Sequence, residues 1–366
     1  MFFVNILKTY RLSRRFFLAC AAMNSLRFSP AKAGTSDNSS FISAWAMFRQ
    51  RFIAPDGRVI DTGNKGISHS EGQGYGMLFA VHAGDRALFE QLWHWTQSML
   101  GQTSCALHSW KYVPDAAIKV PETTAATDAE FMLALALARA ADTWNVPSYR
   151  QAAQSIFRDI RLLLTFQTDS LNLLLPGQNG FVHDDHIVVN PSYYLFPALR
   201  VARDLDDRAQ WDRLFSDGIT LLIRARFGQW HLPADWIAVP KKADDLHPAD
   251  GWPHRFSYDA IRVPLYARWG NVLQQIGSER FSDYWNHFAP HLPAWVDLDT
   301  GERSPYDAST GFRNVALLSG LQSNRLPDSA ALGMFSSTDD YYSSALCLLS
   351  LMIRDEVTTN SQQGAG

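Results

Sequence analysis

Three carboxylic acids stand where the sequence predicts the starts of helices, and acids placed in this way are candidates for acid/base chemistry. Glu71 is followed by GQGYGM, so that three alternate glycines come directly after it. Asp128 lies in the sequence TDAE, at the beginning of a strongly apolar segment. Asp259 lies in SYDAIRVP, where Arg262 follows three residues later and therefore shares its helix face. The sequence thus pairs carboxylates with a cation.

Two of these motifs also have a structural interpretation. Ser68 and Glu71 have the spacing of a capping box. Asp128 could simply interact favourably with the positive end of a helix dipole. The glycines weigh against a simple cap, because each weakens a helical turn by about 1 kcal/mol relative to alanine. They suggest room for a ligand. A dinucleotide site is excluded, since no predicted strand precedes them.

The elements that must position these acids are predicted to be helices. Apolar residues recur at helical spacing throughout, whereas alternating strand patterns are nearly absent apart from short pieces at 180–182 and 186–189. Strongly apolar helices alternate with amphipathic ones, which favours an all-α toroid with an inner and an outer ring. The helix starts then open onto one end of the ring, and paired carboxylates in a cleft are what cleavage of a glycosidic bond requires. The predicted helices are 41–53, 75–83, 85–100, 124–142, 147–166, 192–204, 207–226, 258–275, 279–288, 311–322 and 338–354.

Aromatic residues in predicted loops offer flat surfaces on which sugar rings stack. Trp110 is the better candidate for such a platform, since most of the 12 tryptophans are expected to pack in the core. The sequence HDDH at 183–186 is interpreted as a polar turn rather than a metal site. Motifs of metalloproteases, P-loop NTPases and α/β-hydrolases are absent from the sequence.

The first residues are predicted to be an export signal. Arg14 and Arg15 precede a short apolar run, and AKA at 31–33 is typical of a cleavage site, so residues 1–33 form a signal of possible twin-arginine type. The alternative is an amphipathic first helix. Residues 1–33 hold six Lys and Arg and no Asp or Glu. Their removal therefore changes the formal net charge of the chain from −3 to −9. Nucleic acid is therefore a poor candidate partner, and no uncharged apolar stretch reaches the ~18 residues of a membrane span.

The rest of the chain is predicted to be one catalytic domain, residues 34–357, followed by a disordered tail at 358–366. No Gly/Ser-rich or Pro-rich linker divides it. Cys105 and Cys347 remain after export, and either a disulfide between them or a buried free thiol at Cys347 is compatible with the sequence.

The three acid motifs, in this order and spacing, resemble those of glycoside hydrolase family 8 over about residues 40–355. The resemblance implies an (α/α)6 barrel, a cleft for β-1,4-glucan, and hydrolysis with inversion that needs no metal or other cofactor. It assigns Glu71 as general acid, Asp259 as general base, and Asp128 as the acid that holds the sugar at the cleavage point. Arg262 is expected to contact substrate and to lower the pKa of Asp259.

Further expectations come from the same resemblance. Trp110 and Tyr193 resemble sugar-contacting aromatics of the family. The family usually has Asp-x-Asp where this chain has Asp128 and Glu130, so Glu130 is expected to be supporting structure.

The resemblance is strongest to members encoded beside bacterial cellulose synthase. It implies an endo-β-1,4-glucanase in the periplasm or secreted, with the cellulose synthase complex as a candidate partner. The alternatives are a chitosanase or xylanase of the same family, or a non-hydrolytic glucan-binding component of the secretion machinery.

Overall fold

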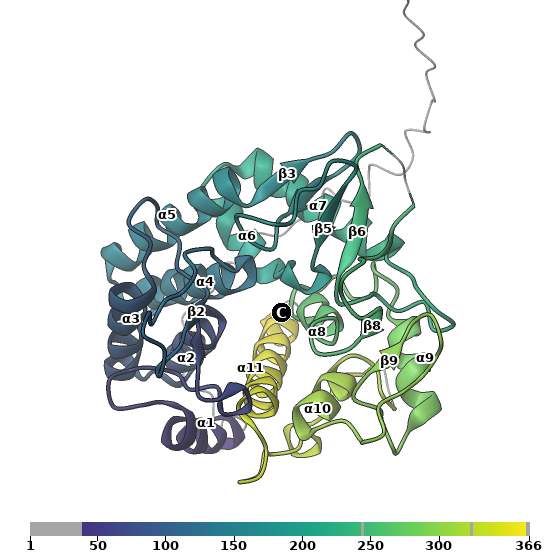
Figure 1. Ribbon diagram of the computed structural model, residues 1–366. Coiled ribbons are helices and arrows are strands. Elements are labelled where there is room, and N and C mark those ends of the chain that lie inside the picture. The colour runs from purple at the N-terminus through teal and green to yellow at the C-terminus, as the bar shows by residue number, and fades with distance from the viewer. Residues whose placement is uncertain (1–38, 243–244, 323–324, 364–366) are drawn as a thin grey trace, which may run out of the picture. The chain divides into compact units, whose positions relative to one another are not determined.

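The most apolar helices of the chain form a closed ring. The computed structural model describes residues 39–242, 245–322 and 325–363, which lie within the compact unit Gly34–Gly366. In these residues each inner helix packs against the next and the last packs against the first (Figure 1). In ring order they are α2 (Ser70–Ala83), α4 (Thr127–Trp144), α6 (Phe196–Leu205), α8 (Arg262–Trp269), α10 (Thr310–Leu318) and α11 (Tyr341–Gln363).

Amphipathic helices cover the outside of this ring. Residues 127–138 of α4 are all buried, whereas α5 buries one stripe that includes Ala153, Ile156, Phe157 and Ile160. This difference is what an inner and an outer helix require. The outer helices are α1 (Ser39–Phe52), α3 (Arg86–Leu100), α5 (Pro147–Leu163), α7 (Arg208–Arg224) and α9 (Glu279–Phe288). The predicted (α/α)6 barrel is confirmed.

Short antiparallel strands and 3₁₀ turns tie down the loops from which several inner helices start. β1 leads directly into α2, β8 precedes the turn that carries Asp259, and β5 is followed by η2 before α6 begins. The pairs are β1 (Ser68–His69) with β2 (Lys111–Tyr112), β3 (Thr165–Gln167) with β4 (Asn172–Leu174), β5 (His186–Val189) with β6 (Ile237–Pro240), β6 with β7 (His247–Pro248), and β8 (Arg255–Phe256) with β9 (Val296–Asp297). The 3₁₀ turns are η1 (Thr62–Asn64), η2 (Pro191–Tyr193) and η3 (Ser329–Ala331).

The glycines after Glu71 serve helix packing, and the prediction that they leave room for a ligand is wrong. They lie inside α2, which begins five residues earlier than predicted. A Cβ added to Gly74 would lie 2.6 Å from Met132 Cβ on α4, and one added to Gly72 would lie 2.9 Å from the Tyr341 hydroxyl on α11. Because glycine has no side chain, the neighbouring helices can approach α2 closely at these positions.

Other boundaries also differ from the predictions. α8 spans only Arg262–Trp269 instead of 258–275, because residues 258–261 form a turn. α11 continues to Gln363, so residues 358–363, predicted to be part of a disordered tail, are helical. Cys105 and Cys347 are both free thiols, and Cys347 is buried in α11. The predicted export signal lies outside the described residues. Among those described, no helix is both long enough and apolar enough to cross a membrane.

Candidate active site

Arg262 brings the three predicted acids together. Its side chain is only 4% exposed at the start of α8. Nη1 pairs with Glu71 Oε1, while Nη2 lies 2.6 Å from Asp259 Oδ1 and 3.4 Å from Asp128 Oδ2. The starts of α2 and α4 and the turn before α8 therefore deliver three carboxyl groups to one cation.

Glu71 is held through one of its two carboxylate oxygens. Oε1 accepts a hydrogen bond from the Tyr75 hydroxyl at 3.1 Å as well as from Arg262, and the Tyr75 hydroxyl is in turn 2.8 Å from that of Tyr266. Oε2 faces His69 Nδ1 at 3.9 Å. Oε2 thus has fewer close contacts than Oε1.

His69, rather than a Ser68/Glu71 capping box, caps α2. Its Nδ1 accepts the Gly72 N–H at 3.0 Å, so Nε2 carries the ring proton and faces Asp61 Oδ2 at 3.3 Å. Burial opposes ionisation of Asp61, but the hydrogen bonds from His69 and Asn64 outweigh it and lower the pKa of this carboxyl. The cap fixes the first turn, from which Glu71 projects.

Asp259 projects from a turn held by a carboxylate distant in sequence. Asp235, just before β6, accepts hydrogen bonds from the backbone N–H of Ser257 at 3.0 Å and of Ala260 at 2.7 Å, and from the Ser257 hydroxyl. Asp235 is 8% exposed. The position of Asp259 is therefore set by tertiary contacts.

Burial dominates the electrostatics of the cluster. It raises the pKa of Asp128 strongly, the charge of Glu71 adds to the rise, and Arg262 opposes it. Burial also raises the pKa of Asp259, although Arg262, Asn190 and Trp236 act against the rise. The expectation that the pKa of Asp259 is lowered is thus wrong, because one shared arginine does not compensate for burial among three acids.

The two predicted aromatic contacts lie near the cluster in different surroundings. The carbonyl of Trp110 accepts the N–H of Ser70 at the start of α2, while its indole donates to Glu122 and its ring lies 4.4 Å from Lys111 Nζ. Tyr193 ends η2. Burial and the charges of Asp128 and Asp259 raise the pKa of its hydroxyl, which places the ring beside the acids.

Glu130 lies in a structural position. It is fully buried, and its carboxylate accepts the His108 N–H at 2.6 Å and lies 3.1 Å from His108 Nδ1. It therefore supports the loop that leads to Trp110.

The histidines of the HDDH sequence stack on each other, with ring centroids 4.4 Å apart, and His186 contacts Asp185. The described residues contain no group of three or more His, Cys, Asp or Glu arranged to hold a metal ion.

Two further residues of the site, Ser192 and Tyr342, were missed by the sequence predictions. Ser192 Oγ accepts a hydrogen bond from Arg262 Nη2 at 2.9 Å. Tyr342 donates to the carbonyl of Tyr258 at 2.5 Å, and its pKa is raised by burial and by the nearby Glu71 and Asp259. Tyr342 falls inside one predicted helix, and Ser192 is the first residue of another, 192–204, although the structure places it in η2. Neither marked a functional position.

The sequence matches the profile of Glycosyl hydrolases family 8 over residues 17–356. A "Probable endoglucanase" of Novacetimonas hansenii is 45% identical over 315 residues, which cover 86% of this chain and 91% of that protein. An endoglucanase of Cellulomonas uda is 37% identical, covering 78% of this chain and 80% of its own. Among solved structures, the endo-beta-1,4-glucanase CMCax from Acetobacter xylinum superposes with a TM-score of 0.84 at 44% identity, covering 88% of this chain and 100% of that one.

The family match and the structural similarity agree with the ring of helices and its acid cluster. The molecule is therefore an (α/α)6 glycoside hydrolase. Within that class, the chain belongs to glycosyl hydrolases family 8.

Proposed function

We propose that the protein is an endo-β-1,4-glucanase that inverts the anomeric carbon, with Glu71 as general acid and Asp259 as general base. The observation that carries the proposal is the convergence of both carboxyl groups and Asp128 on Arg262. The substrate class is supported by the relatives described as endoglucanases, at 45% and 37% identity.

The hydrogen bonds suggest which oxygens react. Arg262 and Tyr75 occupy Glu71 Oε1, so Oε2 is the oxygen that would deliver a proton to the glycosidic oxygen as its bond to C1 breaks. Arg262 Nη2 likewise engages Asp259 Oδ1, and Asn190 and Trp236 also interact with this carboxyl group. As general base, the Asp259 carboxylate would take a proton from the water whose oxygen bonds to C1 from the opposite face. Inversion requires about 6.5–9.5 Å between the two carboxyl groups to admit that water. Exchange with solvent then restores the proton on Glu71 and removes the one on Asp259.

Asp128 would hold the sugar at the cleavage point. Because burial raises its pKa, its protonated form is favoured, and a carboxylic acid both donates and accepts hydrogen bonds with sugar hydroxyls. Tyr193 and Trp110 would contact neighbouring sugars.

Incubation with cellohexaose, followed by NMR of the anomeric protons in the first minutes, tests this function. Inverting cleavage produces the α-anomer first, whereas early β-anomer would contradict the role of Asp259. Binding without cleavage would favour a non-hydrolytic role. Cleavage of chitosan or xylan but not of cellohexaose would move the substrate class to those polymers.

We further propose that the enzyme acts in the periplasm during cellulose synthesis, after removal of residues 1–33. The paired arginines and the AKA sequence support export. N-terminal sequencing of the exported protein should give a chain that begins at Gly34. An intact N-terminus would contradict cleavage there.

A further inference from the structure

We propose that Asp235 is a positioning residue for Asp259, which it places against Arg262 by holding the backbone of the 257–260 turn on both sides of the base. The inference rests on the proposed function of Asp259 and assigns a role to a residue that touches neither substrate nor Arg262.

The hydrogen bonds of Asp235 bracket Asp259. Oδ1 accepts the N–H of Ser257, two residues before the base, and the N–H of Ala260, one residue after it. Oδ2 accepts the Ser257 hydroxyl. Asp235 is itself anchored, since its N–H donates to the carbonyl of Arg255 in β8 at 2.8 Å. One buried carboxyl group thus fixes both ends of the segment.

The turn needs such an acceptor because it precedes a helix. The first N–H groups of α8 and of the turn before it lack the carbonyls that a preceding helical turn would supply. Inside the turn, Ile261 N–H donates to Ser257 O at 2.9 Å and Arg262 N–H to Asp259 O at 3.0 Å. The N–H groups of Ser257 and Ala260 are the ones that Asp235 satisfies. Without it, these buried donors would be unpaired and the turn would rearrange.

Hydrogen-bond geometry, rather than charge, is the property that this role requires. A protonated Asp235 keeps all three bonds, with Oδ1 accepting both N–H groups and Oδ2–H donating to Ser257 Oγ. Burial and the charge of Asp259 raise the pKa of Asp235 to about 7, so this protonated form is accessible near neutrality. Asparagine reproduces it atom for atom, with a carbonyl oxygen and an amide donor.

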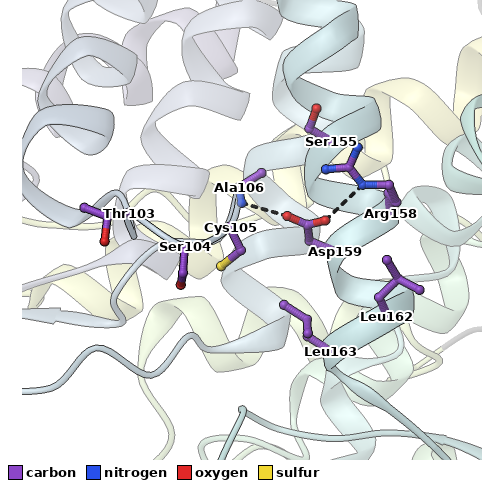
Figure 2. A pocket seen from close by; sticks show the side chains of 9 residues that line it. All are labelled: Thr103, Ser104, Cys105, Ala106, Ser155, Arg158, Asp159, Leu162 and Leu163. Carbon is purple, nitrogen blue, oxygen red and sulfur yellow. Dashed lines mark hydrogen bonds and ion pairs between the residues drawn. The ribbon is translucent and has the colours of Figure 1, made fainter.

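Asp159 offers a matched control on the outside of the ring (Figure 2). It is 6% exposed on α5, its Oδ2 accepts the Ala106 N–H at 2.7 Å, and its Oδ1 lies 3.0 Å from Arg158 Nε. The loop that it pins lines a cavity of about 560 Å³ that shares no lining residue with the acid cluster. Asp159→Ala therefore removes a similar buried anchor where no catalytic acid depends on it. Because the same loop continues to Trp110, the comparison between the two variants uses kcat and not KM.

The test measures kcat and KM on cellohexaose for Asp235→Ala, Asp235→Asn and Asp159→Ala, together with thermal unfolding. We expect Asp235→Ala to lower kcat by about 100-fold, as a 1 Å misplacement does, with KM changed less than about threefold. Asp235→Asn should keep kcat within about threefold of the wild type. Asp159→Ala should lower the melting temperature comparably and leave kcat unchanged.

Two outcomes would overturn the proposal. One is an equal loss of kcat in Asp235→Asn and Asp235→Ala, and the other is an equal loss in Asp159→Ala and Asp235→Ala. If Asp235→Ala does not fold, Asp235→Ser replaces it, because the serine oxygen is bonded to Cβ and stops one bond short of the position of Oδ1, and unchanged kcat in that variant contradicts the inference.

Amide hydrogen exchange of residues 257–261 separates this inference from the proposed function. Faster exchange in Asp235→Ala, but not in Asp235→Asn, supports the positioning role even if the wild type proves inactive on glucans. Unchanged exchange in Asp235→Ala overturns the role whatever the activity.

Discussion

Two arginines at opposite ends of the inner helices hold carboxyl groups, with opposite effects on the acids. At the starts of α2, α4 and α8, Arg262 faces three acids, and the pKa values of Asp128 and Asp259 are raised by burial. Toward the other ends of these helices, Arg139 makes a two-point pair with Glu356 at 2.5 and 2.9 Å. Burial opposes ionisation there too, but Arg139 outweighs it and the pKa of Glu356 is lowered.

The crowding of three acids around Arg262 explains the difference. Glu356 also accepts a hydrogen bond from the Trp269 indole at 2.6 Å and lies 3.9 Å from His82 Nδ1, and both contacts help Arg139 to lower its pKa. Arg262 divides its two terminal nitrogens among three carboxyl groups. A carboxylate held by several donors is suited to structure, whereas a cluster of three acids around one arginine retains exchangeable protons, which acid/base catalysis needs.

The largest expected effect is on turnover when an acid of the cluster is neutralised. Glu71→Gln removes the proton donor but keeps the shape of the side chain, so we expect kcat to fall by about 10³-fold or more while cellohexaose affinity changes less than about threefold. Initial rates and equilibrium binding measure the two effects. Equal losses of binding and turnover would contradict the role of Glu71 as general acid.

Glu356→Gln is the matched control, because the two glutamates are equally exposed at 16% and each is paired with an arginine. Removing the charge of Glu356 should destabilise the fold by ~3–5 kcal/mol, measured by denaturant unfolding, and should leave kcat unchanged at a temperature where the variant is folded. A loss of kcat in the folded variant would contradict the distinction between a catalytic site at Arg262 and a structural site at Arg139.

A smaller effect is expected on the pH dependence of stability. The pKa of Asp235 is about 7 in the folded protein against 3.8 in the unfolded chain, so its stabilising contribution is complete below about pH 4 and is lost as the pH rises through 7. Asp235→Asn mimics the protonated form and removes this titration. The stability of the variant relative to the wild type should therefore increase between pH 5 and pH 8, by on the order of 3 kcal/mol at most. A stability difference between the variant and the wild type that does not change with pH would contradict the raised pKa of Asp235.

The smallest effect is expected outside the Arg262 cluster. Trp110 lies beside the start of α2 without contacting Arg262, so Trp110→Ala should weaken cellohexaose binding and raise KM about 5- to 30-fold, with kcat changed little. Steady-state kinetics checks this split. A fall in kcat with constant KM would instead tie Trp110 to the acids.

The ring of helices and the meeting of Glu71, Asp128 and Asp259 could be predicted from the sequence, since helical periodicity and helix-start acids are local signals. The turn at 257–260 could not, because its acceptor, Asp235, lies 22 residues before Ser257 and no short-range pattern connects them. The pKa of Asp259 was misjudged for a related reason: burial is a property of the packed molecule. The glycines were misread because the helix they approach is distant in sequence.

The close approach of α2 and α4 at Gly74 also bears on motion within the site. With their backbones nearly in contact, the two helices should fluctuate as one rigid body that carries Glu71 and Asp128 together. Asp259 instead lies in a turn outside any helix. The distance between the water-activating and the proton-donating side therefore depends on this turn, and the hydrogen bonds of Asp235 that hold the turn also set the space for one water molecule.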